Sequence, residues 1–132
     1  MDRLVWVCLG SALGGATRYL ISLGALRLLG VGFPYGTLAV NVVGSFGVGL
    51  IMQVSLETAA ISPTARLFLT TGVMGGLTTY STLNYETLQL AADSEWQLAV
   101  TNIVATVAVC LIAGLLGLAS ARALLNASLI NG

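Results

Sequence analysis

Hydroxyl and amide side chains recur at helical spacing in a chain that is otherwise almost entirely apolar. Thr37, Asn41 and Ser45 follow one another every four residues, and Asn102 and Thr106 do the same. Side chains four residues apart lie on one face of a helix, so each set predicts a polar stripe. These groups supply hydrogen-bond donors, and the chain has no histidine for a proton relay. Such a lining suits an anion better than a cation.

A third polar group forms a cluster instead of a stripe. Residues 71–86 read TGVMGGLTTYSTLNYE. Gly75 and Gly76 are poor helix formers, and the hydroxyl side chains of the TTYST run compete for backbone hydrogen bonds. We predict that this segment breaks a helix near the middle of the membrane and that Gly75 needs glycine's conformational freedom there. Unwound backbone at that depth must be buried in protein or line a cavity, where free carbonyls could hold a cation and free N–H groups an anion.

Composition indicates the elements that must position these groups. Hydrophobic residues make up 57% of the 132 residues and charged residues only 8%, whereas a soluble domain carries about 25% charged residues. About 20 apolar residues cross a membrane as a helix, and four such spans fit the chain as one transmembrane domain over residues 1–132: 4–29, 37–54, 63–90 and 96–125. The predicted fold class is therefore all-α integral membrane. The first apolar run continues past Leu20, so we interpret it as a retained span and not a cleaved signal peptide.

Charge and cysteine usage exclude several functions. The net charge is zero, so nothing indicates a nucleic-acid partner. Cys8 and Cys110 lie in apolar runs and form neither a disulfide framework nor a metal site. The sequence has no base beside a nucleophile and no phosphate loop, so we expect no enzymatic activity.

The distribution of the five arginines predicts little preference for one orientation. Arg3, Arg66 and Arg122 fall on the side of the N-terminus, Arg27 falls on the other side, and Arg18 lies inside the first span. This is a weak bias under the positive-inside rule. The chain could therefore insert in both orientations.

Small residues at four-residue spacing predict closely packed helices, because such positions let helix backbones approach in a membrane. The pairs are Gly10 and Gly14, Ser45 and Gly49, and Gly72 and Gly76. The pattern supports a compact bundle and indicates no function by itself.

Three motifs together resemble the Fluc (CrcB) fluoride channels. They are GSALGGATRY at residues 10–19, GTLAVNVVG at 36–44 and GGLTTYST at 75–82. The resemblance covers the whole chain, with the motifs in the family's order. It implies four transmembrane helices, the third broken near the midplane, in an antiparallel dual-topology homodimer surrounded by membrane lipid. It further implies two pores that passively export cytoplasmic fluoride ion across the cell (inner or plasma) membrane, and a structural sodium ion (Na+) at the dimer centre.

The resemblance also assigns roles to individual residues. The backbone carbonyls of Gly75 and Thr78 would bind sodium. Side chains on all four spans would line or flank the fluoride pore: Arg18, Thr37, Asn41, Tyr80, Ser81, Thr82, Leu83 and Thr106. At positions 80 and 83 the family commonly has phenylalanines, whose ring edges face the pore, so this chain departs from the family there.

Other classes of membrane protein remain open at this stage. A small multidrug exporter also has four short spans. Such exporters resemble one another in carrying a glutamate in the first helix, whereas the only charged residue inside the first span of this chain is Arg18. A proton-coupled small-anion transporter needs a coupling carboxylate, and Glu86 is the sole acid inside a span, near its end. A subunit that transports nothing is a further alternative.

Overall fold

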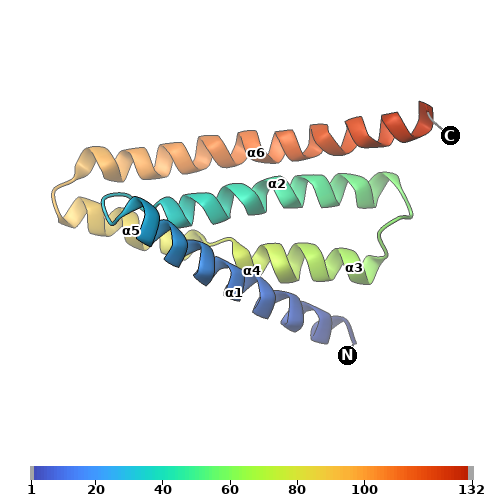
Figure 1. Ribbon diagram of the computed structural model, residues 1–132, viewed down its shortest axis with the longest axis horizontal. Coiled ribbons are helices and arrows are strands. Elements are labelled where there is room, and N and C mark those ends of the chain that lie inside the picture. Colours follow the sequence, from blue (N-terminus) through green and yellow to red (C-terminus); the bar gives the residue numbers. More distant parts are fainter. Residues whose placement is uncertain (1, 131–132) are drawn as a thin grey trace.

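Three long helices dominate the computed structural model, which describes residues 2–130. They are α1 (Asp2–Leu29), α2 (Tyr35–Glu57) and α6 (Trp96–Ile130), and each is long and apolar enough to cross a membrane. α2 and α6 run lengthwise through the molecule, and α1 runs obliquely to them (Figure 1). All the regular elements in residues 2–130 are helices. The protein is a multi-pass membrane protein.

The third predicted span is not one continuous helix. It consists of four consecutive short helices: α3 (Pro63–Leu67), the π-helix η1 (Phe68–Met74), α4 (Gly75–Leu77) and α5 (Tyr80–Ala92). Between α4 and α5 the backbone is extended at Thr78 (φ −78°, ψ 155°) and Thr79 (φ −153°, ψ 120°). The predicted break is therefore present and is confined to these two residues. Thr79 then caps α5, because its hydroxyl accepts a hydrogen bond from the Thr82 amide at 3.2 Å, as N-cap threonines do.

The break changes which helix the chain packs against. Before it, η1 and α4 pack on α1; after it, α5 packs on α6 (Figure 1). α2 makes its most extensive contact with α6, where glycines let the backbones approach. A Cβ added to Gly49 would lie 2.5 Å from the Gly114 carbonyl oxygen, and one added to Gly117 would lie 2.2 Å from that of Phe46. The extended backbone at Thr78 and Thr79 thus lies beside both α2 and α6.

The spacing predicts close helix packing, and the structure shows that the glycine pairs of α1 and the third segment face each other. A Cβ on Gly10 would lie 2.8 Å from the Cα of Gly72, and one on Gly76 would lie 2.6 Å from the Ser11 carbonyl oxygen. A Cβ on Gly14 would lie 2.1 Å from a backbone oxygen of η1. No side chain larger than hydrogen fits such distances, so these glycines set the position of α1.

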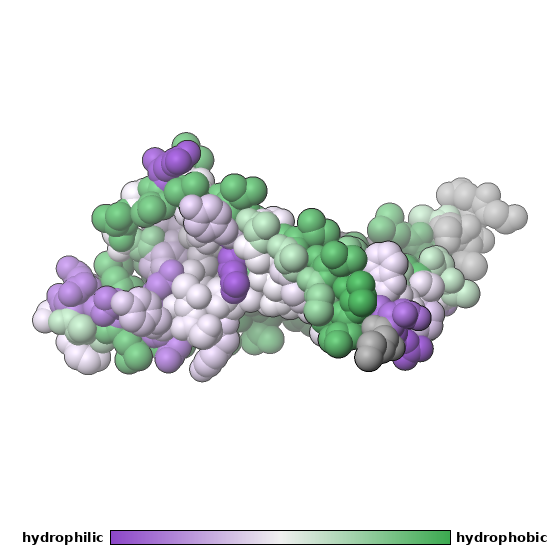
Figure 2. Space-filling model, turned by 90° about the horizontal axis from the view of Figure 1, so that it is seen from below, coloured by the Kyte–Doolittle hydropathy of each residue, from purple (hydrophilic) through white to green (hydrophobic). Residues whose placement is uncertain are grey.

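The outer surface of the helices is largely apolar. Most large side chains of α6 are exposed; Leu111 and Leu115, for example, are 66% and 65% exposed. Figure 2 shows hydrophobic patches beside broad areas of intermediate hydropathy on one face, with strongly hydrophilic residues gathered mainly towards its two ends. This surface suits contact with lipid, since backbone groups in the interior of each long helix are hydrogen-bonded within that helix.

Candidate functional site

A groove of about 590 Å³ lies beside the break in the third segment. Residues of α2, the break, the start of α5 and α6 line it, and no residue of α1 does. Its polar lining residues come from all three neighbouring parts of the chain: Asn41, Ser45, Thr78, Thr79, Thr106 and Cys110. The groove therefore gathers part of the polar stripe of α6, part of the stripe of α2, and the unwound backbone.

The side chain of Asn41 binds the unwound backbone at two points. Its Nδ2 donates to the Thr79 carbonyl at 3.1 Å, and its Oδ1 accepts from the Thr79 amide at 2.8 Å. Both residues are buried, each 8% exposed. A buried backbone amide or carbonyl without a partner is costly, so Asn41 supplies what the missing helical turn would have supplied. One Nδ2 proton of Asn41 is left over, because the amide group carries two.

The same contact releases carbonyl groups at the break. In a continuous helix the Thr79 amide would donate to the Gly75 carbonyl, four residues back, but here it donates to Asn41. The Thr82 amide would likewise donate to the Thr78 carbonyl, but here it donates to the Thr79 hydroxyl. The carbonyls of Gly75 and Thr78 thus both lose their usual helical donors, and carbonyls freed in this way are cation ligands in broken membrane helices.

The expectation that Gly75 needs glycine's conformational freedom is wrong. Its backbone is ordinary right-handed helix (φ −64°, ψ −37°), which any residue adopts. An added Cβ would meet only the Thr70 carbonyl oxygen, at 3.6 Å, an ordinary contact. Gly75 is exposed on α4. If glycine is required at this position, the requirement would come from close contact with another molecule and not from the fold of this chain.

Three predicted pore residues lie in the groove with Asn41 but differ in exposure. Leu83 is 6% exposed and forms part of the buried wall, whereas Tyr80 is 81% exposed and projects from the chain. Thr106 is 4% exposed, and among the residues that the structure describes its hydroxyl has no hydrogen-bond partner. The groove thus holds one buried hydroxyl free to donate.

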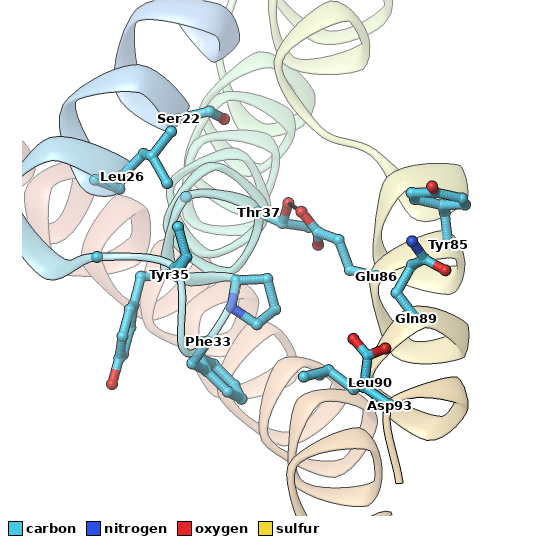
Figure 3. Close-up of a pocket in the computed structure, with 15 residues that line it drawn as sticks. Ser22, Leu26, Phe33, Tyr35, Thr37, Tyr85, Glu86, Gln89, Leu90 and Asp93 are labelled. Carbon is cyan, nitrogen blue, oxygen red and sulfur yellow. Dashed lines mark hydrogen bonds between the residues drawn. The ribbon is translucent and has the colours of Figure 1, made fainter. Parts of the chain in front are cut away.

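Four other predicted residues lie outside the groove. Thr37 donates its hydroxyl to Glu86 Oε1 at 2.7 Å, in a second pocket of about 440 Å³ between the end of α1, the start of α2 and α5 (Figure 3). Ser81 and Thr82 are exposed on α5, next to the break. Arg18 lies half-buried on α1 and lines neither pocket.

Sequence reasoning did not predict the contacts that three further residues make. Thr79 contributes its backbone to Asn41 and its hydroxyl to the start of α5, and only the second contact could be expected from its residue type. Glu86 is recognisable as the only acid inside a predicted span, but its partner Thr37 is 49 residues away. Asn102 belongs to the α6 stripe and donates to Thr87 on α5 at 2.9 Å, a contact that no spacing within one helix predicts.

Comparison with known proteins decides the family. The family model described as "CrcB-like protein, Camphor Resistance (CrcB)" matches residues 5–118. The chain belongs to the CrcB family. Every residue that lines the groove falls inside the CrcB match, so the groove belongs to the part of the molecule that the family shares.

Several curated CrcB relatives carry the name "Fluoride-specific ion channel FluC". The protein of Sorangium cellulosum (strain So ce56) is 49% identical over 95% of this chain and 98% of its own length. That of Trichlorobacter lovleyi (strain ATCC BAA-1151 / DSM 17278 / SZ) is 48% identical over 94% and 99%, and that of Anaeromyxobacter sp. (strain K) is 54% identical over 86% and 90%. The match extends over nearly the full length of each relative.

Proposed function

We propose that this protein is a fluoride-selective ion channel that lets cytoplasmic fluoride leave the cell passively. The observation that carries the proposal is the groove, which holds the buried polar residues Asn41, Thr79 and Thr106 and lies wholly in the region matched by the CrcB family. Relatives that are 48–54% identical bear the name of fluoride-specific channels. An enzymatic role has no support in the site.

The groove offers donors in place of the water around a small anion. The unused Nδ2 proton of Asn41 and the Thr106 hydroxyl are the two buried donors. Transfer of an ion into a buried site is costly unless hydrogen bonds replace its hydration. No carboxylate of the described residues lines this groove, which favours passive permeation over proton coupling.

The proposed assembly is an antiparallel homodimer of dual topology in the cell (inner or plasma) membrane. Residues 63–90 would be the third of four crossings in each subunit, with the break near the midplane. The groove is open along one side, and Tyr80 projects from it, so a second copy would complete the pore. The weak bias of the five arginines is compatible with insertion in both orientations.

Sodium would bind between the subunits at the break. The fit is good, because the Gly75 and Thr78 carbonyls have both lost their helical donors to Asn41 and Thr79. Two such carbonyls are too few for a sodium ion, and a second subunit would double them. Bound there, the ion would hold the two breaks together by electrostatic attraction to the carbonyl oxygens.

Fluoride efflux from liposomes reconstituted with the purified protein tests the function. We expect rapid fluoride efflux, little chloride efflux under the same gradient, and no requirement for a pH gradient. Strict dependence on a proton gradient would favour a coupled small-anion transporter, and transport of organic cations would favour a small multidrug exporter. Absence of any flux from folded protein would indicate a subunit that transports nothing.

A further inference from the structure

Two buried polar atoms on α6 have no hydrogen-bond partner among the described residues: Asn102 Oδ1 and Thr106 Oγ1. Asn102 is fully buried and Thr106 is 4% exposed. They lie one helical turn apart, where Asn102 faces α5 and Thr106 lines the groove. Leaving a buried acceptor and a buried hydroxyl unpaired in the same place is costly, which indicates that a small ligand pairs them.

The contact with α5 sets the chemistry of the unpaired atoms. Thr87 has a single hydroxyl proton, which it donates to the Leu83 carbonyl at 2.8 Å. Its oxygen can then only accept, so it faces the Nδ2 group of Asn102, at 2.9 Å. The carbonyl of Asn102 therefore points away from Thr87 and needs a donor. An anion cannot supply one.

A water molecule has the size and the donors that this position requires. Side chains four residues apart on a helix have Cβ atoms about 5–6 Å apart. Two hydrogen bonds of about 2.8 Å, joined at one water oxygen, span about 4.5 Å, and the Asn102 and Thr106 side chains extend beyond their Cβ atoms to cover the remainder. Buried waters characteristically bind polar groups that would otherwise be unsatisfied.

We propose that one buried water molecule binds between Asn102 and Thr106. The water donates one proton to Asn102 Oδ1 and the other to Thr106 Oγ1. The proton of the Thr106 hydroxyl is then left to point into the groove. This last step rests on the proposed function: the water would hold Thr106 as a donor towards a permeating anion, which makes Asn102 a positioning residue for the pore.

A double-mutant cycle tests the bridge without relying on transport. Asn102→Leu, Thr106→Val and the double variant are compared with the unmodified protein by thermal unfolding in detergent. We expect each single variant to lower the unfolding midpoint, and the double variant to lower it by clearly less than the sum, because replacing both partners leaves nothing unpaired. Additive losses would overturn the bridge. Thr87→Val is the control: it removes the other contact of Asn102, and its effect should add to that of Thr106→Val.

Fluoride efflux and a crystal structure complete the test. We expect Asn102→Leu to slow efflux roughly tenfold, about the effect of one hydrogen bond, and to add nothing in a Thr106→Val background. Equal slowing in both backgrounds would refute the positioning role of Asn102. If a variant does not fold, a crystal structure of the unmodified protein that resolves ordered water decides the site: density within hydrogen-bond distance of both atoms supports it, and its absence overturns it. If the unmodified protein passes no fluoride, the proposed function fails, while the unfolding cycle and the density still decide the water site.

Discussion

Replacing Asn41 with aspartate removes the donor half of its contact with the break. Asn41→Asp keeps an oxygen to accept from the Thr79 amide, now at 2.8 Å. It places a second carboxylate oxygen against the Thr79 carbonyl, where Nδ2 now donates at 3.1 Å. The substitution therefore changes hydrogen bonding and charge with almost no change of shape.

The expected effects on folding and on permeation differ in size. A buried carbonyl left without its donor costs about 1–3 kcal/mol, against a typical folding free energy of about 5–15 kcal/mol. The buried charge adds to this cost, but the hydrogen bond from the Thr79 amide stabilises the carboxylate. An anion about 4 Å from the new carboxylate would be disfavoured by about 4 kcal/mol at an effective dielectric constant of 20, or roughly a thousandfold in occupancy. We therefore expect a folded variant that passes almost no fluoride.

Size-exclusion chromatography, thermal unfolding and fluoride efflux separate these effects. Asn84→Asp is the matched control, because Asn84 is exposed on α5 and the substitution introduces the same charge. We expect the control to retain efflux close to that of the unmodified protein. A monodisperse Asn41→Asp protein that passes fluoride at the unmodified rate would refute the placement of Asn41 in the pore. Aggregation of Asn41→Asp alone would show that its contact with Thr79 is chiefly structural.

Three further predictions concern packing, sodium and topology. Gly14→Ala should lower the unfolding midpoint, because its Cβ would lie 2.1 Å from the Val73 carbonyl oxygen, whereas the neighbouring Gly15→Ala, with nothing within 4 Å, should not; equal midpoints would contradict the described contact of α1. Thr78→Ser should retain sodium-dependent efflux, because the proposed ligand is the main-chain carbonyl and survives the change. Gly75→Ala should leave the subunit folded but weaken dimer formation. Efflux that is unaffected by rigorous replacement of sodium would argue against the ion. A C-terminal reporter should be found on both sides of the membrane in intact cells, and labelling from one side alone would exclude dual topology.

The residue types within each segment were sufficient to predict the membrane helices, their close contacts and the break. Apolar length predicts membrane helices, and glycines at four-residue spacing predict close helix contact, since both depend on the side chains of one segment. The break was predictable for the same reason, because Gly75, Gly76 and the hydroxyl run after them all disfavour helix. The stripe of Asn102 and Thr106 also follows from helical geometry alone.

Partners across helices were decided only by the tertiary structure. Thr37 and Asn41 share one predicted stripe, yet one binds Glu86 and the other binds the backbone of Thr79. A helix turns about 100° per residue, so side chains four apart are displaced by about 40° and one turn along the axis, and the broken third segment meets them with different groups. Which carbonyls the break releases depends on the same contacts, because the Thr79 amide leaves its helical acceptor only where Asn41 is close enough to replace it. Residue types determine which hydrogen bonds are possible, whereas the packing of distant helices determines which of them form.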